Sequence, residues 1–162
     1  MSVIDDLIYD RTQADVDRVF TLKNKILAGG LSSLSAEEKS EYMAGMKGAY
    51  NVSDLNRVGT AVEYIAQQFA DQGYVVSVNP KKDWVVNAVP NVSQLEEYLQ
   101  NIDTLRGVIT VAESTPETPA NMALLNYVKA NDIEQILFDV STLLTNVEKQ
   151  LYFSGEIFSN EV

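Results

Sequence analysis

The sequence contains no cysteine and no histidine among its 162 residues. Disulfide bonds, zinc sites built from Cys and His, and catalysis by a thiol or an imidazole of this chain are therefore excluded. Basic residues are also scarce, with 12 Lys and Arg against 23 Asp and Glu, which gives a formal net charge of −11. This charge disfavours nucleic acid and anionic membranes as partners, because both repel an acidic surface.

Long apolar runs are absent as well. No stretch approaches the roughly 20 apolar residues that a membrane-spanning helix needs, and the first residues, MSVIDDLIYD, are acidic where a signal peptide is basic. We therefore expect a protein made in a cytoplasm without a secretion signal. The hydrophobic fraction of 46% still suffices for one packed core. We predict a single helical domain over 1–162, with short tails at 1–10 and 156–162.

Sequence motifs for nucleotide binding and for hydrolysis are missing too. The chain has no P-loop pattern, no glycine pattern of a dinucleotide-binding fold or a serine hydrolase, and no calcium-loop pattern. Asp15 and Asp17 would point about 200° apart on a helix, so they cannot share a proton or a metal ion. We predict no catalytic residue, no cofactor and no metal site. The many carboxylates leave a cell-wall hydrolase as a minor alternative.

Helical periodicity is what the sequence does contain. Capping residues and apolar residues spaced three or four apart predict helices over 13–28, 36–46, 52–72 and 91–109, and a long helix that starts near Asn121 or Asn131 and ends at Gly155. The predicted fold class is all-α, a bundle of about five helices. Two apolar stripes should pack together in one core: Leu55, Val58, Val62, Ile65 and Phe69, and the near-heptad run Ile133, Ile136, Leu137, Val140, Leu143, Leu144, Val147 and Leu151.

Local signals add three smaller expectations. Asn51 and Asn91 each begin an Asn-Val-Ser sequence, which we interpret as a helix cap rather than a glycosylation site. Met43 and Met46 should lie on the inner side of the second helix. Arg57, beside the first stripe, either joins a partly buried ion pair or, as we favour, packs its stem along the helix with its head in water.

Residues 74–88 are the least helical part of the chain. Two short β-prone runs around Asn79-Pro80 predict either a small β-hairpin or an extended crossing loop. This segment contains Trp84, the only tryptophan. The favoured interpretation is that Trp84 fills the open side of the bundle, and the alternative is that it anchors an interface.

A second aromatic cluster follows the last helix. It either folds back on the bundle or docks on another subunit. Together with the tryptophan, its members are the candidate interface residues: Trp84, Tyr152, Phe153, Ile157 and Phe158.

Six strings spread over nearly the whole chain carry a family resemblance. They are DLIYDRTQADVD at 6–17, MKGAYN at 46–51, DLNRV at 54–58, KDW at 82–84, ANDIE at 130–134 and YFSGEI at 152–157. In these strings the chain resembles a small domain of structural proteins from prophages of Gram-positive bacteria. That domain recurs near tail, baseplate or host-attachment genes.

The resemblance implies a function in the phage particle. We expect a non-enzymatic virion component of the tail or baseplate, a structural or adaptor protein that associates with itself or docks on other tail proteins. The alternative is a module that binds a host cell-surface ligand, either a cell-wall glycan or a protein, with Trp84 and nearby polar groups as its platform.

Overall fold

Helices form all the regular structure in the part of the chain that the structure describes. This computed structural model describes the backbone of residues 2–159 and the side chains of residues 2–150. The described elements are two short 3-10 helices, η1 (Val3–Asp6) and η2 (Leu31–Ser33), and five α-helices: α1 (Gln13–Gly29), α2 (Ala36–Ala44), α3 (Val52–Asp71), α4 (Val92–Val108) and α5 (Tyr127–Ser159). The prediction of an all-α fold with five helices is confirmed.

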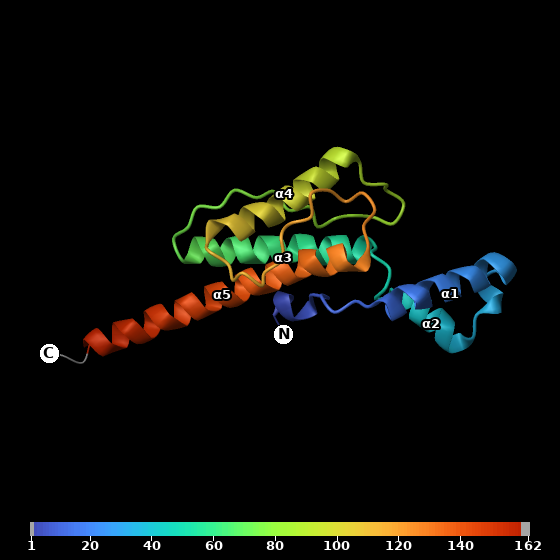
Figure 1. Cartoon of the computed structure of the whole chain (residues 1–162), viewed down its shortest axis with the longest axis horizontal. Coiled ribbons are helices and arrows are strands. Elements are labelled where there is room, and N and C mark those ends of the chain that lie inside the picture. Colours follow the sequence, from blue (N-terminus) through green and yellow to red (C-terminus); the bar gives the residue numbers. More distant parts are fainter. Residues whose placement is uncertain (1, 160–162) are drawn as a thin grey trace.

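The helices α3, α4 and α5 pack side by side and form the body of the molecule, with η1 against α3 and α5 (Figure 1). Both predicted stripes meet in the main core, where Val58, Ile65, Phe69, Ile136 and Leu137 are fully buried. Burying each of these side chains contributes about 1.5–3 kcal/mol. The predicted caps are also present, since Asn51 and Asn91 each form a capping box at the start of α3 and α4.

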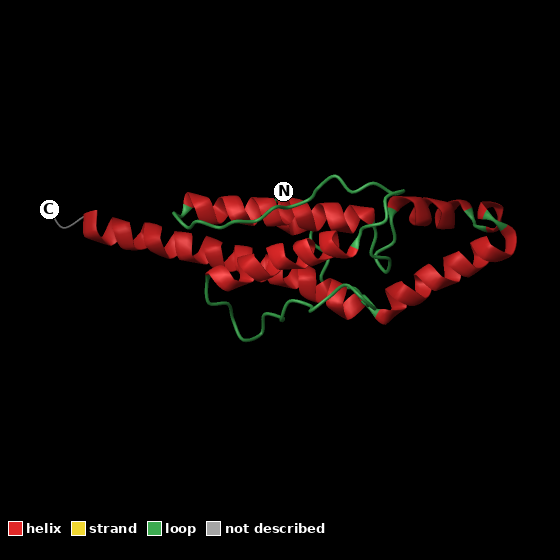
Figure 2. Ribbon diagram, turned by 90° about the horizontal axis from the view of Figure 1, so that it is seen from above, coloured by secondary structure: helices red, strands yellow, loops and turns green. Residues whose placement is uncertain are grey.

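The helices α1 and α2 form an arm, residues 13–44, that extends away from the body (Figures 1 and 2). The arm and the chain that leaves it hold a second, smaller cluster of buried residues, Leu22, Leu34 and Met46. Met43, which we expected on the inner side of its helix, is instead 83% exposed. The reason is that α2 is covered on one side only, by α1, and Met43 lies on the other.

The predicted β-hairpin at 74–88 is not supported, because these residues contain no strand. The segment instead runs back along α3 in an extended conformation (Figure 1). Its backbone bonds to side chains of the neighbouring helices: the amide of Trp84 donates to Asn56 over 2.8 Å, and the amide of Asn79 donates to Asn101 over 2.9 Å. These bonds take the place of a strand ladder. Gly59 permits the close approach, since a Cβ there would collide with the carbonyl oxygen of Lys81.

Both ends of the chain differ from the predicted tails. The segment 1–10 contains η1, and its Ile4 and Leu7 are buried in the main core. At the other end α5 continues through Gly155 to Ser159, because one glycine inside a helix costs only about 1 kcal/mol. The same helix begins at Tyr127 rather than near Asn121 or Asn131, after Asn126, whose side chain accepts the amide of Lys129 as a cap does.

Candidate functional site

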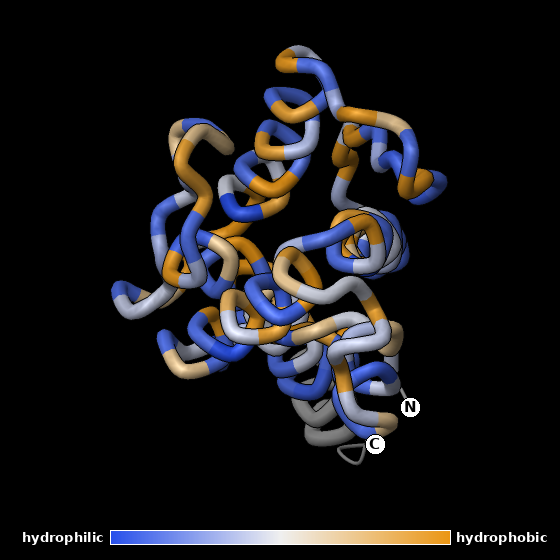
Figure 3. The backbone as a smooth tube through the Cα atoms, turned by 90° about the vertical axis from the view of Figure 1, so that its right-hand side faces the viewer, coloured by the Kyte–Doolittle hydropathy of each residue, from blue (hydrophilic) through white to orange (hydrophobic). Residues whose placement is uncertain are grey.

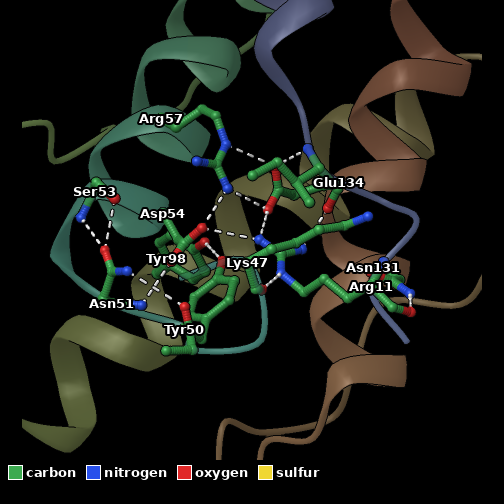
Figure 4. Close-up of polar contacts among 12 residues, drawn as sticks. Arg11, Lys47, Tyr50, Asn51, Ser53, Asp54, Arg57, Tyr98, Asn131 and Glu134 are labelled. Carbon is green, nitrogen blue, oxygen red and sulfur yellow. Dashed lines mark hydrogen bonds and ion pairs between the residues drawn. The ribbon is translucent and has the colours of Figure 1, made fainter. Parts of the chain in front are cut away.

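Four charged side chains meet inside the body, between α3, α5 and the segment that precedes the arm (Figure 4). They are Arg11, Asp54, Arg57 and Glu134, and we call them the ion cluster. Their side chains are 1%, 5%, 16% and 0% exposed in that order. Two positive and two negative charges compensate one another, so the interior holds no net charge.

Glu134 of α5 lies at the centre of the ion cluster. Its Oε1 accepts from Nη2 of Arg11 at 2.7 Å and from Nη2 of Arg57 at 2.8 Å. Its Oε2 accepts from Nε of Arg57 at 2.9 Å and from the backbone amide of Ile8 at 2.7 Å. One carboxylate therefore ties α5 to α3 and to the N-terminal segment, and both of its oxygens are fully hydrogen-bonded.

Arg11 fixes the root of the arm. Its Nε donates to the carbonyl of Lys47 at 3.1 Å, and its backbone amide and carbonyl pair with the side chain of Asn131 at 3.0 and 2.9 Å. Arg11 precedes α1 and Lys47 follows α2, so the chain that enters the arm is bonded directly to the chain that leaves it. Gly48 allows this crossing, because a Cβ there would collide with the carbonyl group of Asp15.

The ion cluster is suited to holding the fold together rather than to proton transfer. Burial would lower the pKa of Arg57, but the hydrogen bonds and charge of Glu134, and then those of Asp54, raise it above its ordinary value. Asp54 is engaged as well, since it accepts from both arginines and from the amide of Asn51. Each oxygen of the two carboxylates therefore accepts at least one hydrogen bond from within the chain.

The sequence interpretation missed most of this cluster. The favoured interpretation of Arg57, with its head in water, is wrong, because its guanidinium lies between Asp54 and Glu134. Arg11 and Glu134 were not singled out at all. The available signal was the position of Glu134, which lies between Ile133 and Ile136 on the inner face of α5. A charge in the middle of an apolar stripe needs a buried partner.

A pair of tyrosines lies next to the ion cluster. The hydroxyls of Tyr50 and Tyr98 hydrogen-bond to each other, and the guanidinium of Arg11 lies 5.4 Å from the ring centre of Tyr50. Burial, followed by the charge of Glu134, raises the pKa of Tyr50 above its ordinary value of 10.0. Burial, followed by the proximity of Tyr50, raises the pKa of Tyr98 in the same way. Both hydroxyls therefore stay protonated in the folded protein at alkaline pH.

These pKa shifts predict a loss of stability above pH 10. The unfolded chain releases the two protons around its ordinary tyrosine pKa of 10.0, whereas the folded chain retains them. Below pH 10 the two tyrosines therefore leave the free energy of unfolding unchanged with pH. Above pH 10 the free energy of unfolding should fall, by up to about 1.4 kcal/mol per pH unit for each tyrosine. Urea unfolding between pH 8 and pH 11 measures the slope. Tyr98→Phe should make the free energy of unfolding depend less steeply on pH, whereas Tyr42→Phe, at an exposed position, should leave the slope as in the wild type. Equal slopes in the wild type and both variants would mean that the tyrosine pair does not cause the loss of stability.

Trp84 belongs to the main core and is only 5% exposed. The ammonium group of Lys81 lies over its ring, 5.2 Å from the centre. Its indole N–H has no hydrogen-bond partner among the described residues. Beside it is a cavity of about 260 Å³ with polar walls that include Asn79, Glu97 and Asn101, although the side chains of all three are already hydrogen-bonded within the chain. The buried ring thus offers little surface to a ligand.

Trp84→Ala should destabilise the fold by about 3–5 kcal/mol, the usual result of removing a buried aromatic side chain. Thermal unfolding measures the loss. Val85→Ala, at a neighbouring position that is 59% exposed, is the matched control and should change stability little. Near-native stability of Trp84→Ala, together with lost association, would instead make Trp84 an interface anchor.

The other candidate interface residues lie outside the part of the chain whose side chains the structure describes. They are Tyr152, Phe153, Ile157 and Phe158, and their role stays a prediction. The described part contains no group of carboxylates arranged to hold a metal ion. None of its helices combines the length and the apolar character needed to cross a membrane.

Apolar side chains gather where the arm meets the body. A cavity of about 400 Å³, which we call the arm groove, separates α1 from the start of α5. Its lining residues are Arg11, Gln13, Val16, Val19, Phe20, Gly48, Tyr50, Leu125, Asn126, Tyr127 and Ala130. Phe20 in its wall is 54% exposed, and Leu27 farther along α1 and Leu124 before α5 are 74% and 92% exposed. The arm groove is therefore a concave surface with apolar side chains in both of its walls.

Comparisons with protein-family models, with curated proteins and with solved structures find no match to this chain.

Proposed function

We propose that this chain is a non-enzymatic structural or adaptor protein of a phage virion, located in the tail or baseplate region. It acts by associating with itself or by docking on other tail proteins. The placement in the tail rests on the family resemblance of the sequence, and the mode of action rests on the arm.

The observation that carries the proposal is the uncovered apolar surface of the arm. Large apolar side chains lie exposed on each of its elements: Phe20, Leu27, Leu31, Tyr42 and Met43, at 54%, 74%, 56%, 44% and 83%. Apolar surface of this kind, on a rigidly attached element, is typical of a protein–protein contact. The ion cluster supports the same function, because it holds the root of the arm in one orientation before a partner arrives.

The host-surface alternative has less support. It relied on Trp84 and nearby polar groups as its platform, and Trp84 is buried. The hydrolase alternative needs two carboxyl groups that face a cleft, whereas the two buried carboxylates are each held by two arginines.

Purified phage particles test the proposal. Particles induced from a bacterium that encodes the chain are separated on a density gradient, and their proteins are quantified by mass spectrometry. The chain should sediment with the tails at a fixed ratio to another tail protein. If the other tail proteins are present in those fractions and this chain is absent, the proposal is wrong.

A further inference from the structure

We propose that the arm groove of one copy receives the C-terminal end of α5 from a second copy, so that copies join head to tail. This inference rests on the proposed function and names the surface and the partner that it uses. Three properties of the chain carry it: the shape and chemistry of the groove, the reach of α5, and the charges at the two surfaces.

The groove is suited to a helix. One wall is a face of α1 that carries Val16, Val19 and Phe20, which are three and four residues apart, and the opposite wall is formed by Leu125 and Tyr127. The ion cluster lies at its base, where Arg11 and Tyr50 close the cavity from within the body. The walls are therefore held in place, and no described part of the same chain fills the space between them.

The end of α5 is placed to be the occupant. Leu144 is the last buried residue that the structure describes on this helix, and residues 148–150 are exposed. From Leu144 to Ser159 the helix rises about 22 Å, and it runs past the ends of α3 and α4 (Figure 1). The groove lies at the opposite end of the body, beside the start of the same helix. A chain cannot place this end in its own groove, so the contact is between copies.

The sequence of the helix end matches the groove in composition. Residues 151–158 include five large apolar residues, Leu151, Tyr152, Phe153, Ile157 and Phe158. Burial of apolar side chains is the main favourable term in most protein associations, so these residues suit a docking segment.

The charges at the two surfaces are complementary. Lys23 lies one helical turn beyond the groove residues Val19 and Phe20. Lys129 lies next to Ala130 in the opposite wall. Neither lysine has a carboxylate partner among the described residues. The end of the chain carries Glu148, Glu156 and Glu161 against one lysine. The last carbonyls of a helix add partial negative charge of their own. An acidic helix end therefore meets these two lysines, while Asp17, which accepts from the side chain of the groove residue Gln13 at 2.8 Å, adds an acid at the edge of the groove.

Apolar residues occur on both sides of the arm groove. Figure 3, which views the molecule from the arm end, has apolar segments both on the arm and on the adjoining end of the body. The arm groove brings residues of the arm and of the body together around one cavity. Because its two contact surfaces differ, such a contact is heterologous, and repeated copies either close into a ring or continue as a filament.

Cysteine cross-linking tests the contact directly, since the chain has no cysteine of its own. A Gln13→Cys protein is mixed with a Ser154→Cys protein and treated with a short bis-maleimide. The expected product is a mixed dimer of the two proteins. Met43→Cys replaces Gln13→Cys in the matched control, because Met43 is 83% exposed but lies on α2, outside the groove. Equal yields in both mixtures, or a product made only of two Gln13→Cys chains, would overturn the proposal.

A substitution in the groove wall gives a second readout. Phe20→Asp should weaken self-association about 10-fold or more in the dissociation constant, since it removes one apolar anchor. The circular dichroism and melting temperature should stay unchanged, because Phe20 is 54% exposed. Ser40→Asp, at an exposed polar position of α2 outside the groove, is the control. Lys23→Glu should be rescued by Glu156→Lys. If Phe20→Asp associates as strongly as the wild type, the groove is not the contact surface, even if the chain is found in tail particles. If the chain is absent from tail particles, the proposed function is wrong, whatever the cross-links show.

Discussion

Ile136→Asp should unfold the protein at ordinary temperatures. Ile136 is fully buried in the main core, where α5 packs against α3 and α4. An aspartate there would lose its hydration with no cation to pair with, at a cost of several kcal/mol in addition to the lost apolar contacts. Native domains have only about 5–15 kcal/mol of stability in total, so this single change removes most or all of it.

Far-ultraviolet circular dichroism and thermal unfolding check this result. Thr142→Asp, on an exposed position of the same helix, is the matched control and should melt like the wild type. Ile65→Asp makes the same test from α3, where Ile65 is also fully buried. A wild-type melting temperature for either Ile136→Asp or Ile65→Asp would mean that α3 and α5 do not pack together through these residues.

Glu134→Gln should cost about 3–5 kcal/mol of stability, the usual effect of removing one partner from a buried ion pair. The amide has the size of the carboxylate but no charge, and its NH₂ group would face the guanidinium N–H groups of Arg11 or Arg57. Two buried arginines would then share Asp54 alone, and the interior would hold an uncompensated positive charge.

Urea unfolding measures the loss, with Glu148→Gln as the control at an exposed position on the same helix. Adding Arg57→Gln to Glu134→Gln should cost less than the sum of the two single losses, because the two side chains are in direct contact. Additive losses, or a Glu134→Gln protein as stable as the wild type, would contradict a charge-balanced cluster.

Local sequence predicted most of the helices, because their signals are local. The capping boxes at Thr12, Ser35, Asn51 and Asn91 and the stripe from Leu55 to Phe69 act within a few residues of one another. The helix starts therefore agree with the structure wherever a cap marks them. The start of α5 was missed because its cap residue, Asn126, lies between Asn121 and Asn131, and each of these also resembles a helix cap.

The ion cluster and the arm could not be predicted in this way, because they depend on contacts between distant parts of the chain. Ile8 and Glu134 are 126 residues apart, and Arg11 and Asp54 are 43 apart. The spacing of apolar residues likewise predicts that α1 is a helix, but it does not show which of these residues other parts of the chain bury. Leu22 is buried and Leu27 is 74% exposed, although both are leucines of one helix.

Light scattering of the intact chain across a range of concentrations tests the central claim most directly, namely that a second copy occupies the arm groove. We predict a mass above the 18.0 kDa of one chain that rises with concentration. The mass of Phe20→Asp should remain lower at each concentration. A wild-type mass of 18.0 kDa at every concentration would contradict the claim.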